Sequence, residues 1–180
     1  MKLNIHLFKY EMLFALANKS ILLSTSFFVI LILTVGIGFG QTGDSSEKTV
    51  IAIIWIATAL SSLLSIKEMF QNDFEDGTLD FYMLSAATLE TIICLKAFTH
   101  WVTTNLPIIF LIPLISIPLG ITFYHSILIS LVMLVSTPAL SFISTLGAAL
   151  TLGEKGGNLL MSIFILPTFL PIMIFGMKIS

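Results

Sequence analysis

Residues Ile21–Gly40, ILLSTSFFVILILTVGIGFG, carry no charged side chain over the whole stretch. An α-helix rises about 1.5 Å per residue, so about 20 apolar residues cross the hydrocarbon core of a bilayer. A surface helix of a soluble protein would need a polar face, and this stretch has none. It therefore predicts a membrane-spanning helix, which decides the class of the protein.

Similar apolar stretches recur along the chain and are separated by short polar segments such as QTGDSSEK (41–48) and TLGEKGGN (151–158). The composition agrees, because 57% of the 180 residues are hydrophobic and only 10% are charged, against about 25% charged in ordinary soluble domains. We predict one all-α integral membrane domain, 1–180, with five spans at about 21–40, 49–66, 91–118, 126–150 and 159–176.

The lysines predict the orientation, because short cytoplasmic loops of membrane proteins are enriched in positive charge. With a cytoplasmic N-terminus, the inner side holds Lys2, Lys9, Lys19, Lys67 and Lys155, and the outer side holds Lys48 and Lys178. All eight basic residues are lysine and they form no basic patch, so nucleic-acid binding is not expected. The lipid bilayer is the expected surrounding.

Residues 1–19 show a different pattern. Leu3, Leu7, Tyr10 and Phe14 recur at helical spacing between charged positions. This predicts a helix that lies along the inner membrane surface. The alternative is a frayed terminus without fixed structure.

The most polar part of the chain is 67–90, after the second predicted span. Ile66, Phe70 and Phe74 are four residues apart and so share one helical face, while acidic residues occupy the other faces. Gly77 is placed to end this helix. We predict that the second span continues into the cytoplasm and turns at Gly77. The segment is either a docking element for a cytoplasmic partner or a solvated acidic loop.

The third predicted span carries Lys96 and His100 on one helical face, with Trp101 next to them. Ionisable groups inside a membrane are costly and suggest function, so one hypothesis has His100 binding haem or relaying a proton. The favoured alternative places both near the inner interface, with the Lys96 side chain extended toward water and Trp101 anchored among the headgroups.

Common catalytic and ligand-binding motifs are missing. The sequence has no GxxxxGK[ST], HExxH or GxSxG motif, and no cluster of histidine and cysteine with metal-binding spacing. The GxGxxG match at 38–43 follows a predicted span instead of a strand, so it does not indicate a dinucleotide site. We predict no catalytic residue, no metal and no cofactor bound by this chain.

The chain resembles the cytochrome c maturation protein B family, also called haem exporter protein B. The resemblance covers residues 50–176 in order. It rests on Trp55–Leu64, on Met69–Phe70 with Asp73–Leu79, on Lys96 with His100–Trp101 and Pro107, and on Thr137–Pro138 through Gly147–Gly153 to Leu159–Leu160, Pro167, Pro171 and Ile174–Gly176.

The resemblance implies a permease similar to the ABC-2 type, with six spans, in a bacterial inner (plasma) membrane or in a mitochondrial inner membrane. Implied partners are an ABC ATPase like CcmA, a haem-handling membrane protein like CcmC, a small membrane protein like CcmD and a haem chaperone like CcmE. ATP would be bound by the partner ATPase, and haem would be handled by the complex.

The sequence departs from the family pattern at several places. It has Lys67–Glu68 where the family often has an arginine, and Ser85–Ala87 where a proline is common. The last loop carries an acidic residue, in Glu154–Asn158. The family has a sixth span, which we expect to be missing here.

The resemblance also implies roles for the polar segments. The permease would couple ATP hydrolysis to haem delivery and to release of the haem-loaded chaperone during c-type cytochrome biogenesis. The expected partner-coupling residues are Phe70, Asp73, Phe74, Asp76, Gly77, Gly153 and Lys155, with the two aromatic rings in a groove of the ATPase and the carboxylates paired with its basic residues. The alternative is a membrane-embedded haem-binding protein or enzyme that uses His100.

Overall fold

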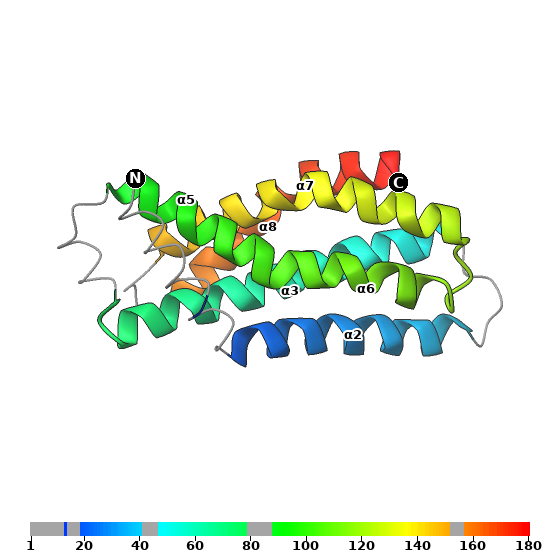
Figure 1. The fold of residues 1–180 in the computed structure, drawn as a ribbon, viewed down its shortest axis with the longest axis horizontal. Helices are drawn as coiled ribbons and strands as arrows, with labels where there is room; N and C mark the ends of the chain where they lie inside the picture. The colour runs from blue at the N-terminus through cyan, green and yellow to red at the C-terminus, as the bar shows by residue number, and fades with distance from the viewer. Residues whose placement is uncertain (1–12, 14–18, 41–46, 79–87, 152–156) are drawn as a thin grey trace.

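The computed structural model is a bundle of long, roughly parallel and antiparallel helices (Figure 1). It describes residues 13, 19–40, 47–78, 88–151 and 157–180. The helices are α2 (Lys19–Gly40), α3 (Glu47–Glu75), α5 (Leu89–His100), the π-helix η1 (Trp101–Asn105), α6 (Leu106–Ser116), α7 (Phe123–Leu150) and α8 (Gly157–Ile179). The predicted interfacial helix at 1–19 lies almost wholly outside the described residues.

Helices α5, η1 and α6 follow one another without a break and form a single rod, here called span three. The described part of the chain thus crosses the bundle five times, once in each of the five predicted ranges. Three described helices are long and apolar enough to cross a membrane: Glu47–Ile66, Leu89–Ser116 and Phe123–Leu150. Shorter apolar stretches occupy α2 and α8. The predicted all-α integral membrane fold is confirmed.

Helix α3 is the centre of the bundle, because it contacts α2, span three, α7 and α8. Small residues at Ala57, Ser61 and Ser65 form a buried stripe along it, as expected where helices pack closely in a membrane. Trp55 is fully buried. Its ring lies against Gly176 of α8, so closely that a Cβ at that position would overlap the ring.

The π-helix has a local cause in the sequence. Pro107 has no N–H group, and in an α-helix its ring would collide with the carbonyl group four residues earlier. Just before it, the Leu106 N–H donates to the Trp101 carbonyl, five residues back instead of four. This wider turn leaves Thr103, Thr104 and Asn105, three consecutive residues, all buried in the bundle. Such π-turns are frequent at functional sites.

The structure confirms that the second span continues as a helix beyond its apolar part. The apolar part of α3 ends at Ile66, but the helix continues to Glu75. Gly77 then adopts φ +70°, a left-handed conformation that favours glycine, and its N–H group donates to the Phe74 carbonyl at 3.4 Å. Helix α3 is therefore followed by a turn at the predicted residue.

Candidate functional site

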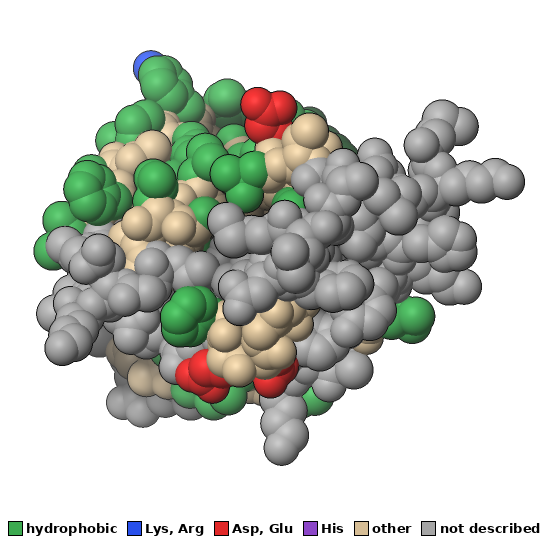
Figure 2. Space-filling view, turned by 90° about the vertical axis from the view of Figure 1, so that its left-hand side faces the viewer, with side chains coloured by type: hydrophobic (Ala, Val, Ile, Leu, Met, Phe, Trp, Pro, Cys, Tyr) green, Lys and Arg blue, Asp and Glu red, His purple; other side chains and the backbone are tan. Residues whose placement is uncertain are grey.

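The end of the bundle at which α3 stops and α5 begins carries three of the predicted coupling residues, Phe74, Asp76 and Gly77. Acidic and hydrophobic side chains are visible on this face (Figure 2). Phe74 is 56% exposed, and Glu75 and Asp76 are exposed beside it. Glu90, in the first turn of α5, adds another exposed acid. A bare aromatic ring bordered by carboxylates suits contact with a protein that offers an apolar groove and basic residues.

The structure places the other predicted coupling residues as follows. Gly77 forms the turn described above, and Phe70 lies in helical backbone one turn before Phe74, although its side chain is outside the described part. Gly153 and Lys155 fall outside the described residues altogether. The structure therefore brings together Phe74, Asp76 and Gly77.

Asp73 does not belong to this exposed set. Its side chain is 3% exposed and forms an ion pair with Lys96 of α5, whose side chain is 1% exposed. The expectation that Asp73 faces basic residues of a partner is corrected by this contact. Along a helix, neighbouring residues point about 100° apart, so Asp73 faces inward while Phe74 faces outward.

Lys96 was expected to extend toward water, and it is instead enclosed by protein. The physical reason lies at the end of α3. The last carbonyl groups of a helix carry partial negative charge, and Asp73 and Glu75 add to it without any basic residue in the last turn. The ammonium group of Lys96, supplied by α5, pairs with the Asp73 carboxylate in this region.

His100 is fully buried at the junction of α3, α5 and α7. Its Nε2 atom lies 3.2 Å from the Ser62 carbonyl oxygen and its Nδ1 atom 3.1 Å from Ser141 Oγ. Ser62 Oγ donates to Asn105 Oδ1 at 2.7 Å, and Asn105 Nδ2 donates to Ser141 Oγ at 2.8 Å. These four residues form a closed polar ring inside the bundle.

The ring fixes the state of the imidazole. A carbonyl oxygen only accepts, so Nε2 must carry the proton and donate to Ser62. Ser141 already accepts from Asn105 and can donate to Nδ1, which gives each of the four hydrogen bonds of the ring one donor and one acceptor. Neutral His100 with the proton on Nε2 satisfies all four members, and neither nitrogen is left free for a metal.

Two further hydrogen bonds join the same helices, and together with the polar ring they form a polar layer. Ser65 of α3 is hydrogen-bonded to Thr104 of η1 at 2.6 Å, and the Trp101 indole donates to Thr137 of α7 at 2.9 Å. The Trp101 side chain is half-buried and its indole is hydrogen-bonded to α7 within the bundle. The polar layer binds α3, span three and α7 to one another.

The sequence interpretation missed Ser62, Asn105 and Ser141 as partners of His100. A signal was available for Asn105, which is an amide within an apolar span and two residues before Pro107. Serine, in contrast, is common in spanning helices, where its hydroxyl can bond to its own backbone. Nothing in the local sequence distinguishes Ser62 or Ser141 from such residues.

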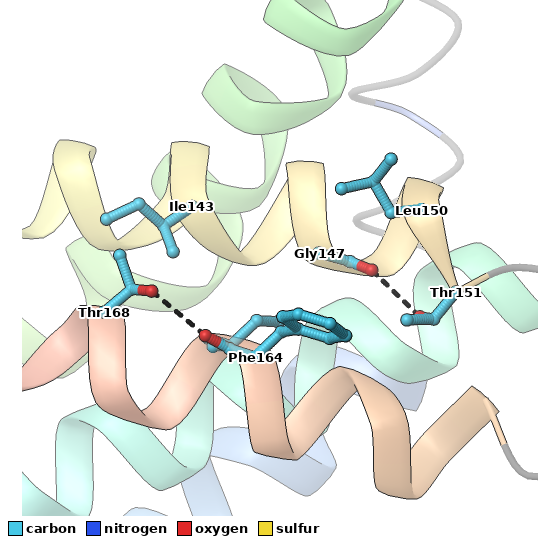
Figure 3. A pocket seen from close by; sticks show the side chains of 7 residues that line it. Ile143, Gly147, Leu150, Thr151, Phe164 and Thr168 are labelled. Atoms are coloured by element: carbon cyan, nitrogen blue, oxygen red, sulfur yellow. Dashed lines mark hydrogen bonds between the residues drawn. The ribbon is translucent and has the colours of Figure 1, made fainter.

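A groove of about 490 Å³ lies between α7 and α8 (Figure 3). Gly147 lets Ile165 approach, and Ile143, Leu150 and Phe164 supply apolar walls. The two hydroxyl groups in it are occupied by their own helices, since Thr151 donates to the Gly147 carbonyl and Thr168 to the Phe164 carbonyl. The described residues thus give the groove mainly apolar walls.

We predict that His100→Ala destabilises the protein by about 1–3 kcal/mol, since it leaves buried partners unsatisfied. His100→Gln should lose less, because its amide can still donate toward Ser62. The thermal midpoint of the detergent-solubilised protein measures both. An absorption band of bound haem in the purified chain that is lost in His100→Gln would contradict the ring and favour haem ligation.

The fold and this site define an all-helical, multi-pass membrane protein whose buried ionisable residues, in the described part of the chain, join helices. The chain matches the family model described as CcmB protein over residues 2–180. The chain belongs to the CcmB family, as the resemblance predicted.

Curated relatives support this assignment. "Heme exporter protein B" of Rhodobacter capsulatus is 36% identical over 157 residues, which are 87% of this chain and 72% of the relative. The protein of the same name from Paracoccus denitrificans is 37% identical over 156 residues, 86% of this chain and 71% of the relative. The protein of the same name from Haemophilus influenzae is 32% identical over 176 residues, which are 97% of this chain and 80% of the relative.

Proposed function

We propose that this chain is the permease subunit of an ABC complex that serves haem export and c-type cytochrome maturation. The observation that carries the proposal is the similarity to relatives named "Heme exporter protein B", which extends over most of the chain. In this role the chain performs no chemistry itself. A partner ATPase hydrolyses ATP, and the permease couples that hydrolysis to haem delivery and to release of a haem-loaded chaperone.

The proposed ATPase contact is the exposed end of α3. This end projects beyond the apolar stretch that closes at Ile66 and presents Phe74 beside Glu75 and Asp76. The lysine distribution supports a cytoplasmic position for this end of α3. The membrane that holds the chain would be the inner membrane of the cell. The CcmC-like, CcmD-like and CcmE-like proteins complete the proposed assembly.

The alternative of a haem-binding protein or enzyme centred on His100 has less support. A haem ligand needs a free imidazole nitrogen, and both nitrogens of His100 lie within hydrogen-bonding distance of protein atoms. A ligand role would therefore require the polar ring to open.

The proposal is tested by purifying the tagged chain in mild detergent and identifying what is recovered with it. We expect an ABC ATPase at near-equal yield, and a tagged unrelated multi-pass protein from the same host serves as the control. Purification of the inserted chain without any ABC ATPase would refute the proposed function.

A further inference from the structure

The buried pair of Asp73 and Lys96 lies next to the proposed docking residues but does not belong to them. Asp73 precedes the exposed Phe74 by one residue, yet its side chain is 3% exposed. The Asp73–Lys96 contact therefore lies between the packed interior of the bundle and the proposed docking surface.

Helix α3 is attached to span three at more than one level. At mid-bundle, Ser62 contacts His100 and Asn105, and Ser65 contacts Thr104. Asp73 is attached to Lys96 eight residues further along the same helix, which corresponds to about 12 Å. A helix held at one level can pivot about that level. A second attachment near its end makes it move together with its neighbour.

The charge of the pair also needs an explanation. Burying two ions costs about as much as their attraction returns, and a well-packed apolar pair is often equally stable. Stability alone therefore does not account for a carboxylate and an ammonium group at this position. What an ion pair adds is a directional link between two particular atoms.

Resting on the proposed function, we propose that Asp73 and Lys96 are positioning residues that transmit movement of the ATPase-bound end of α3 to span three. A push on Phe74 displaces Asp73, and Asp73 carries Lys96 and helix α5 with it. The polar ring at His100 then passes the displacement to α7 through Ser141. Docking and transmission are thus separate tasks of neighbouring residues.

The test replaces the pair by apolar residues of similar size, Asp73→Leu with Lys96→Met, in the whole complex. Phe74 is kept, so we expect the ABC ATPase to be recovered at the normal yield. The yield of mature c-type cytochrome per inserted permease should fall about fivefold or more, the lower end of typical coupling between sites. Normalising to inserted protein separates transmission from folding, because a purely structural contact would change only the amount inserted.

The exchanged pair, Asp73→Lys with Lys96→Asp, is the matched rescue variant, and we expect it to restore most of the normalised yield. Normal yield in the apolar variant would overturn the inference while leaving the proposed function intact. If the apolar variant is absent from the membrane, the exchanged variant provides the test. A low yield of mature cytochrome per inserted permease in that variant, at normal insertion, would then overturn the inference. Failure of the wild-type chain to recover an ATPase would instead refute the proposed function.

Discussion

Replacing Lys96 with methionine is expected to destabilise the protein by about 3–5 kcal/mol, the usual result when one partner of a buried ion pair is removed. The Asp73 carboxylate would stay 3% exposed and lose the Lys96 ammonium group as its ion-pair partner. It would also remain beside the carbonyl groups at the end of α3, where negative charge is unfavourable. A loss of this size exceeds a hundredfold in the folding equilibrium, so little inserted, folded protein should remain.

The measurement is the amount of folded protein in the membrane together with its thermal midpoint in detergent. Lys178→Met is the matched control, because Lys178 is exposed in the last turn of α8 and an exposed change of this kind costs at most about 0.5 kcal/mol. Adding Asp73→Leu to Lys96→Met should recover most of the lost stability. A Lys96→Met protein as stable as the control would show that the two charges are not paired in the folded protein.

The double substitution Phe70→Ala with Phe74→Ala is expected to abolish recovery of the ABC ATPase. The two residues are one helical turn apart on α3, and Phe74 is 56% exposed. Burying an aromatic ring contributes about 1.5–3 kcal/mol, so losing two rings should weaken the complex by roughly two orders of magnitude or more. Maturation of c-type cytochromes should fall with it.

The readout is the ATPase recovered per molecule of inserted permease. Phe123→Ala provides the control, since Phe123 is 64% exposed at the start of α7, at the opposite end of the bundle. It should leave ATPase recovery unchanged. If the double variant still recovers the ATPase at the wild-type yield, the end of α3 is not the main contact, and the segment 151–158 becomes the better candidate.

Most of the fold was predictable because its signals are local. A stretch of about 20 uncharged apolar residues must bury its backbone polar groups within a helix once it is in lipid, so the five ranges follow from composition alone. The turn at Gly77 was equally accessible, because a left-handed residue after a helix favours glycine. The outward face of Phe74 and Asp76 follows from helical spacing beside that turn.

The sequence by itself therefore determined the membrane class, the helices and the family resemblance. Only the tertiary structure decided what the buried polar residues do. Helical spacing places Lys96 and His100 on one face, but it cannot tell whether that face meets lipid, water or another helix. The answer depends on Asp73, twenty-three residues away, and on Ser62 and Ser141, which reach His100 from two other helices. Partners so distant along the chain become neighbours only when the helices pack, because burial without water obliges each polar group to find a partner within the bundle.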